Sequence, residues 1–267
     1  MGKSIGIIAI KGGVGKTSIS SSLAVDLAKN QGGKVLVIDG NYSAPNLGIH
    51  MDVLSPEKTI HHVLGERVPI RKAIYENHGV DIIPGSVSYT RYFNPLKLKD
   101  KIHNLKKDYD YVIIDGSPSL NDELLSTILA SDLLFVVSTP DYPTLSCSIR
   151  AAKLAKLRGK PIAGILLNKV RDPNFELSIK EIESATDIPV VARILDEKIH
   201  TRALFNRVPV SLAYKNSNFA REINNLGRVI AEKKRRKSVF DFIFGKKLEE
   251  VNREVLRENL YTNVFSS

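Results

Sequence analysis

The stretch that most constrains this chain joins an apolar run to a glycine-rich turn close to the amino end. Residues 7–10 are apolar, residues 11–18 read Lys-Gly-Gly-Val-Gly-Lys-Thr-Ser, and apolar residues at helical spacing follow within 23–28. A strand, a glycine loop and a helix in this order are typical of a phosphate-binding P-loop. Glycines let backbone N–H groups converge on phosphate oxygens, and the positive end of the helix faces the same anion. The stretch predicts a nucleotide-binding α/β domain.

The residue types in the loop predict how ATP or ADP would be bound. We expect Lys16 to reach the β- and γ-phosphates and the hydroxyl of Thr17 to ligate Mg²⁺. The expected nucleotide contacts in this stretch are Gly12, Gly13, Val14, Gly15, Lys16, Thr17 and Ser18. Lys16 is also a candidate catalytic residue, because it would bring positive charge to the phosphates.

A second motif follows near the middle of the chain. Residues 111–114 form an apolar strand pattern that ends in Asp115, which is the Walker B arrangement. Asp115 is therefore a candidate ligand of the Mg²⁺ shell, directly or through water, and the N–H of Gly116 is placed to approach the γ-phosphate. Strand patterns alternate with helix patterns over more than two hundred residues, which predicts a doubly wound, mostly parallel sheet.

The early lysine of the loop carries a resemblance to a known family. The sequence Lys-Gly-Gly-Val-Gly-Lys-Thr, with Lys11 at its start, resembles the deviant P-loop of the MinD/ParA family of dimerising ATPases, and the resemblance covers roughly residues 3–234. It implies an ATP-dependent homodimer in which Lys11 reaches the partner's phosphates, so the resemblance makes Lys11 both a nucleotide contact and a candidate catalytic residue. It also implies that Asn168, which ends a predicted strand, hydrogen-bonds the adenine, as an amide with both donor and acceptor can do.

The loop after the second predicted strand departs from the family pattern. The family has Asp-x-Asp in this switch I segment, whereas this chain has Asp39-Gly40-Asn41. An asparagine can hydrogen-bond the attacking water but cannot take its proton, and a positioned base typically contributes ~10²–10⁴ in rate. Two interpretations stay open: hydrolysis is slow, or Asn41 only caps the loop while Asp39 manages Mg²⁺ through water. Both residues are candidate catalytic positions, and Asp39 is a candidate metal ligand.

The carboxyl-terminal part predicts an anionic partner. The net charge is +10, and the densest basic block is 233–237. We expect a P-loop ATPase domain over 1–237 and an amphipathic helical tail over 238–267, in which Phe240, Ile243 and Phe244 share one face between flanking Lys and Arg. The tail resembles the membrane-targeting helix of the family's MinD branch, but here 248–267 follow it. A contact with the protein's own surface or with a dimer partner is the alternative.

Three functions remain open at this point. The leading one is a MinD-like, ATP-dependent dimerising ATPase with an unknown protein regulator, which acts as a spatial regulator at the inner membrane surface. The others are a ParA-like partition ATPase that binds DNA non-specifically and a nucleotide-bound scaffold with negligible turnover. A single cysteine gives no disulfide framework, so we expect a cytoplasmic protein that associates peripherally with the membrane in its ATP state. His61-His62 lacks companion metal ligands, and we expect it on a solvated helix face.

Overall fold

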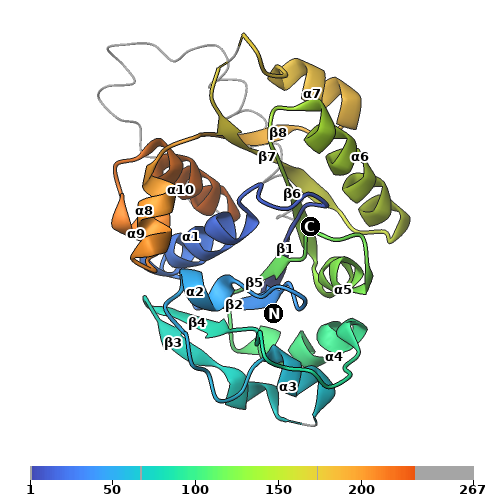
Figure 1. Ribbon diagram of the computed structural model, residues 1–267, viewed down its shortest axis with the longest axis vertical. Helices are drawn as coiled ribbons and strands as arrows, with labels where there is room; N and C mark the ends of the chain where they lie inside the picture. Colours follow the sequence, from blue (N-terminus) through green and yellow to red (C-terminus); the bar gives the residue numbers. More distant parts are fainter. Residues whose placement is uncertain (1, 67, 173, 232–267) are drawn as a thin grey trace.

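The computed structural model describes residues 2–66, 68–172 and 174–231, and they form one sheet with helices on both faces (Figure 1). The strands are β1 (Lys3–Ile8), β2 (Val35–Gly40), β3 (Tyr75–Asn77), β4 (Val80–Ile83), β5 (Tyr111–Gly116), β6 (Leu133–Ser138), β7 (Ile162–Val170) and β8 (Val190–Leu195). The helices are α1 (Lys16–Lys29), α2 (Leu47–His50), α3 (Ile60–Gly65), α4 (Leu98–His103), α5 (Asp122–Ala130), α6 (Tyr142–Leu157), α7 (Ile179–Thr186), α8 (Ile199–Phe205), α9 (Val210–Ala213) and α10 (Asn218–Ile230).

The sheet has the order β3-β4-β2-β5-β1-β6-β7-β8, and every neighbouring pair is parallel except β3 with β4. The central strands are apolar and buried on both faces, as parallel strands covered by crossover helices must be. The expected doubly wound, mostly parallel sheet is confirmed. The short antiparallel β3 at one edge was not expected from the sequence.

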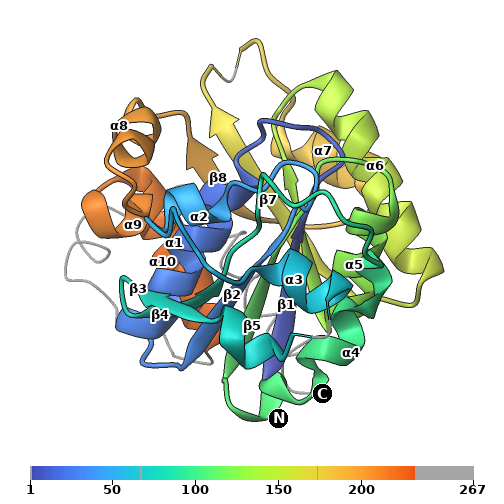
Figure 2. The same cartoon turned by 60° about the horizontal axis from the view of Figure 1, so that its bottom comes forward.

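Two helical layers cover the sheet. On one face α1 and α10 pack together, and Phe219, Ile223 and Leu226 of α10 belong to the same buried cluster as Leu23 and Leu27 of α1. On the other face α5, α6 and α7 cover β1, β6, β7 and β8, while α3 and α4 cover the β2 side (Figures 1 and 2). The P-loop helix α1 is therefore held between the sheet and the last described helix of the chain.

Local capping explains where several helices begin. α6 starts at Tyr142 because Asp141 caps its first turn by accepting a hydrogen bond from the N–H of Thr144 at 2.8 Å. Pro143 is tolerated there since first-turn N–H groups have no partner inside the helix. Within the described ranges, no helix has the length and apolarity needed to cross a membrane. The predicted tail helix over 238–267 lies outside the described residues.

Candidate functional site

The candidate site lies at the carboxyl edge of the sheet, because the P-loop, switch I and the Walker B segment all follow parallel strands. Asp39 near the end of β2 lies in register with Asp115 near the end of β5, and Gly40 pairs with Gly116. Ile7 of β1 pairs with Asp115 on the other side of β5. Ligands bind at this edge in open α/β sheets. Residues more than seventy positions apart in the sequence thus meet at one edge.

The P-loop is a glycine cradle with one buried lysine. Gly13 and Gly15 have φ of +75° and +96°, backbone conformations that side chains with a Cβ rarely adopt. Gly15 leads into α1, so the first N–H groups of this helix face the loop. The Lys16 side chain folds back over the loop, with Nζ 3.5 Å from the carbonyl oxygen of Lys11, and the residue is only 7% exposed. Burial lowers the pKa of Lys16, and the charge of Asp115 partly offsets this effect.

Asp115 is buried next to the hydroxyls of α1. Its Oδ1 accepts a hydrogen bond from Ser20 Oγ at 2.9 Å, and Thr17 also donates to this carboxyl. Burial raises the pKa of Asp115, while the hydrogen bonds from Thr17 and Ser20 and the charge of Lys16 act in the opposite direction. Ser20 is a site residue that the sequence analysis missed, and its position one helical turn after Lys16 and Thr17 was the available signal.

The first aspartate of switch I, Asp39, stabilises the segment by accepting hydrogen bonds from its backbone. Asp39 is fully buried, and its two oxygens accept hydrogen bonds from the N–H groups of Asn41 and Leu47, each at 3.1 Å. Burial, and then the nearby charge of Asp115, raise the pKa of Asp39 to about 8. The Asn41 side chain donates to the carbonyl oxygen of Ala44 at 2.6 Å and is nearly buried. The paired carboxylates of Asp39 and Asp115 are a ligand set that suits a hard divalent cation.

Asn168 closes the cradle from the β7 side. Its Nδ2 donates a 2.7 Å hydrogen bond to the carbonyl oxygen of Val14, and a Cβ on Gly15 would come within 2.3 Å of the same nitrogen. Its Oδ1 is buried and has no hydrogen-bond partner within the described parts of the chain. A buried acceptor without a donor costs free energy, so this atom is suited to a ligand that supplies an N–H. The exocyclic amine of adenine is such a donor, whereas guanine has an acceptor at that position.

Lys11 lies at the rim of the site and not inside the cradle. Its side chain is 42% exposed, and Nζ contacts Thr144 Oγ1 at 2.8 Å and Asp141 Oδ1 at 3.3 Å. Both partners belong to the start of α6, which was not identified as part of the site from the sequence. The two lysines of the loop therefore have different environments: Lys16 is buried over the phosphate cradle, and Lys11 points to an open rim.

Two buried side chains behind switch I were also missed. The expectation of a solvated face for His61 was wrong: the residue is buried, its Nε2 donates to the carbonyl oxygen of Tyr42 at 3.0 Å, and its Nδ1 accepts from the N–H of Ser86 at 3.0 Å. Burial lowers the pKa of His61, so the neutral ring ties switch I to the loop after β4. Glu123 of α5 accepts a hydrogen bond from Ser43, and its other oxygen is buried without a partner in the described chain.

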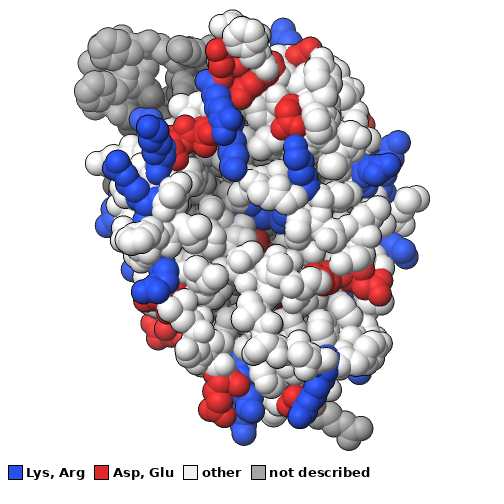
Figure 3. Space-filling model, in the orientation of Figure 1, with Lys and Arg blue, Asp and Glu red and all other residues white. Residues whose placement is uncertain are grey.

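The residues present fit a magnesium–nucleotide complex. A cradle of backbone N–H groups, a buried ammonium group, two buried carboxyl groups and an orphaned amide oxygen all lie at one edge of the sheet. Figure 3 shows a hollow in the middle of one face, with small areas of basic and acidic atoms at its floor and most charges around the rim. The fold and this site place the chain in the class of P-loop nucleotide-binding proteins.

Comparisons with known proteins narrow the class. The family model described as an AAA domain matches residues 2–148. An uncharacterized ATP-binding protein of Methanocaldococcus jannaschii is 35% identical over 230 residues, covering 85% of this chain and 87% of that protein. The septum site-determining protein MinD of Thermotoga maritima is 28% identical, covering 86% and 88%. The chain therefore belongs to the MinD/ParA family of P-loop ATPases, as its sequence motifs indicated.

Solved structures agree with this placement. MinD from Pyrococcus horikoshii, complexed with Mg-ADP, superposes with a TM-score of 0.79 at 27% identity and covers 85% of this chain and 95% of that one. The cell division ATPase MinD of Pyrococcus furiosus gives a TM-score of 0.80 at 27% identity, with 85% and 98% covered. The expected fold and enzyme class are confirmed.

Proposed function

We propose that this ATPase binds ATP with Mg²⁺, pairs with a second copy of itself in that state, and acts as a MinD-like spatial regulator at the inner membrane surface. Three features support the proposal: the glycine cradle with its paired carboxyls, the second lysine at the rim, and the basic, aromatic sequence of residues 233–247. A protein regulator is part of the proposal, although its identity is open.

Each residue at the carboxyl edge has a distinct part in this function. The N–H groups of residues 12–18 bind the phosphates, and Lys16 brings a positive charge to them without an ordering cost, because it is already buried in place. Thr17, Asp39 and Asp115 would hold Mg²⁺, which supplies positive charge beside the β- and γ-phosphates when bound. Asn168 offers its free acceptor to the base.

Slow turnover is part of the proposal. Asn41 stands where the family has a carboxylate, and its amide is already bonded to the carbonyl oxygen of Ala44. An amide can hold a water in place but cannot accept its proton. A slow hydrolytic step would prolong the ATP-bound, paired state, which is the state a positioning protein uses. Negligible turnover would instead favour the scaffold function.

The environment of Lys11 is the single observation that carries the proposal. Its ammonium group has no place inside its own cradle, and hydrogen bonds to Asp141 and Thr144 hold it at an open rim. A lysine so placed can leave these exposed partners for a phosphate on a second copy, because a surface ion pair is worth only ~0–1 kcal/mol.

The test compares the two lysines of the loop by light scattering and nucleotide binding. Lys11→Ala should keep the affinity of the monomer for ADP within about two-fold and abolish ATP-induced pairing. Lys16→Ala should lose nucleotide affinity itself. Pairing of the Lys11→Ala protein with ATP, at the same concentration as the unaltered protein, would refute the role of Lys11. Strong ATP-dependent binding to duplex DNA, with no binding to anionic vesicles, would instead support the partition function.

A further inference from the structure

One face of α5 lies against switch I. Glu123, Ser126 and Thr127 share this face, because residues three and four positions apart lie on the same side of a helix. Each of the three side chains lies next to one residue of switch I: Glu123 next to Ser43, Ser126 next to Tyr42, and Thr127 next to Gly40. The start of α5 is therefore fixed against the loop that carries an asparagine where the family has a carboxylate.

The position of α5 places Glu123 beyond the ends of two strands. A Cβ built on Gly40 or on Gly116, the last residues of β2 and β5, would come within 3.0 Å and 3.3 Å of the Thr127 side chain. α5 runs from the carboxyl edge of the sheet to the amino edge, because it connects the end of β5 to the start of β6. Glu123 precedes Thr127 by one turn, so its backbone lies about 6 Å further out. Its side chain tilts outward as well, since helical side chains lean toward the N-terminus.

The carboxyl group of Glu123 is buried, and only one of its oxygens is satisfied. The residue is 7% exposed, and its Oε1 accepts the hydrogen bond from Ser43. Its Oε2 is buried and has no hydrogen-bond partner among residues 2–66, 68–172 and 174–231. Asn121 holds the backbone in place by accepting from the N–H of Glu123 at 3.1 Å. A buried carboxyl oxygen without a donor costs free energy, so Oε2 suits a small donor that comes with the substrate.

The order of the strands indicates from which side water can reach the γ-phosphate. In the proposed binding mode the base lies at Asn168 of β7, the phosphates lie over the loop after β1, and the metal ligands come from β5 and β2. Because these strands follow one another as β2-β5-β1-β6-β7, the γ-phosphate is directed toward β5 and β2. The attacking and leaving oxygens of phosphoryl transfer lie roughly in line, so water attacks from the β2 side. Asn41 and Glu123 both lie on this side.

We propose that Glu123 supplies the carboxylate that switch I lacks, and that its Oε2 holds the attacking water and accepts its proton. The water oxygen forms a bond to the γ-phosphorus, the bond from this phosphorus to the β,γ-bridging oxygen breaks, and ADP leaves with that electron pair. The proton on Glu123 then passes to the released phosphate, which restores the carboxylate. This inference rests on the proposed function and names the residue behind the turnover that remains with Asn41 in switch I.

The test measures phosphate release by the full chain at saturating ATP with Mg²⁺. Glu123→Gln keeps the side-chain shape and the acceptor for Ser43 but removes the base. We expect kcat to fall at least ten-fold, because a positioned base contributes ~10²–10⁴ and the glutamine oxygen can still hold a water. KM, the affinity for ADP and ATP-induced pairing should stay within about two-fold, and ATP-bound pairs should last longer by the factor that kcat loses. The matched control, Asp122→Asn, removes an exposed carboxylate from the same helical turn and should change kcat less than about two-fold.

A double variant separates a catalytic carboxylate from a merely structural one. In the Asn41→Asp protein, switch I has its own carboxylate, so adding Glu123→Gln should lower kcat less than about three-fold. If Glu123 acted only by holding α5 against switch I, the loss would be the same with Asn41 or with aspartate at that position. Rescue by Asn41→Asp is therefore the signature of a shared chemical role.

The remaining outcomes are each decisive. Equal losses of kcat in Glu123→Gln and Asp122→Asn would overturn the inference, because charge in the first turn of α5 would then explain both. A loss of ATP affinity with unchanged kcat would make Glu123 a binding residue and would also overturn it, as would undetectable phosphate release by the unaltered protein. If the unaltered protein hydrolyses ATP but never pairs, the proposed function is refuted, while the ratio of the kcat values still decides the role of Glu123.

Discussion

Replacing Gly15 by alanine tests the geometry of the P-loop most directly, because two separate costs meet at this position. The backbone φ of +96° lies outside the regions that residues with a Cβ normally occupy. A Cβ built there would also come within 2.3 Å of Asn168 Nδ2, a distance at which something must move. The nitrogen cannot move freely, because it donates a buried 2.7 Å hydrogen bond to the carbonyl oxygen of Val14.

The size of the expected stability loss follows from the backbone conformation of Gly15 and from its close approach to Asn168. A left-handed backbone costs a residue with a Cβ roughly 1–2 kcal/mol. Turning the Asn168 amide away leaves the carbonyl oxygen of Val14 buried without a donor, at a cost of about 1–3 kcal/mol. Gly15→Ala should therefore lower the free energy of unfolding by about 2–5 kcal/mol. A domain with a typical stability of about 5–15 kcal/mol would still fold, so the effect on nucleotide binding can be measured.

Urea unfolding and titration with a fluorescent ATP analogue form the assay, and Gly32→Ala is the matched control. Gly32 has φ of +75° and open space around a built Cβ, so alanine there carries the backbone cost alone. The excess loss of stability in Gly15→Ala, about 1–3 kcal/mol, then measures the contact with Asn168. Nucleotide affinity should fall at least ten-fold in Gly15→Ala and stay unchanged in Gly32→Ala, which lies after α1.

A double variant makes the reasoning refutable. In Gly15→Ala/Asn168→Ala the clash is gone, but the carbonyl oxygen of Val14 still lacks its donor. The two substitutions should therefore be non-additive, and Asn168→Ala should lower stability less in the Gly15→Ala protein than it does alone. Equal stability losses for Gly15→Ala and Gly32→Ala, together with unaltered nucleotide affinity, would contradict the tight contact between the loop and β7.

Three further predictions concern switch I and the helix behind the loop. Without nucleotide and Mg²⁺, the pKa of Asp39 is about 8 against an ordinary value of 3.8. The protonated form of Asp39 therefore gives its full contribution to the stability of the fold below about pH 4, and this contribution is lost as the pH rises to about 8. Asp39→Asn should flatten the fall of Tm between about pH 4 and about pH 8. An unchanged slope in this range would exclude Asp39 as the cause of that fall. Asn41→Asp should raise phosphate release at least ten-fold, toward the ~10²–10⁴ of a positioned base, and no change would mean that the missing carboxylate does not limit turnover. Asp26→Ala removes the buried acceptor of the Asn30 and Asn224 amides and should lower the free energy of unfolding in urea by about 2–5 kcal/mol, whereas a loss below 1 kcal/mol would show that these amides find other partners.

The central strands and the P-loop could be predicted because their signals are local. The apolar runs before residues 11, 39 and 115 each form a buried strand, and the glycine loop opens a helix as expected. Parallel strands with both faces covered leave a continuous apolar pattern, which is readable without knowledge of the partners. Parallel strands joined by right-handed crossovers have their carboxyl ends at one edge, so the edge that holds the site could be placed as well.

Side chains that act through distant contacts could not be predicted in this way. Lys11 contacts Asp141 and Thr144 about 130 residues later, and no local pattern near either segment reveals that pairing. His61 was misassigned because the absence of companion metal ligands favoured a solvated face, whereas its two ring nitrogens are satisfied by backbone groups of Tyr42 and Ser86. Polar side chains are buried where tertiary partners exist, and the sequence alone does not supply those partners.

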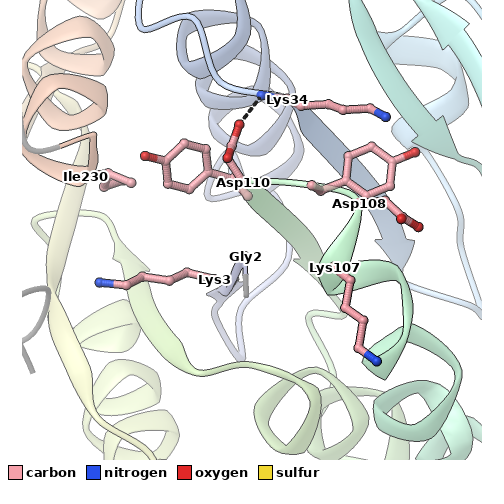
Figure 4. A pocket seen from close by; sticks show the side chains of 9 residues that line it. Gly2, Lys3, Lys34, Lys107, Asp108, Asp110 and Ile230 are labelled. Atoms are coloured by element: carbon pink, nitrogen blue, oxygen red, sulfur yellow. Dashed lines mark hydrogen bonds between the residues drawn. The ribbon is translucent and has the colours of Figure 1, made fainter.

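The packing between α1 and α10 bears on how the two edges of the sheet communicate. α1 begins at Lys16 in the phosphate cradle, and α10 ends at Ile230, which lines a pocket at the opposite, amino edge of the sheet (Figure 4). Asp26 of α1 is buried against Asn224 of α10, and a Cβ on Gly227 would come within 2.2 Å of its Oδ2. Close-packed interiors have low compressibility and transmit strain, so a displacement of α1 would be felt by α10.

Pairing through Lys11 would offer a direct link between ATP and the proposed membrane contact. A pair held by Lys11 would present two copies of residues 233–247 to one bilayer. The second contact is then intramolecular, and the gain is set by effective concentration. Vesicle affinity in ATP should consequently rise steeply with protein concentration near the dimer Kd, and Lys11→Ala should remove that steepness while leaving the weak binding of the monomer.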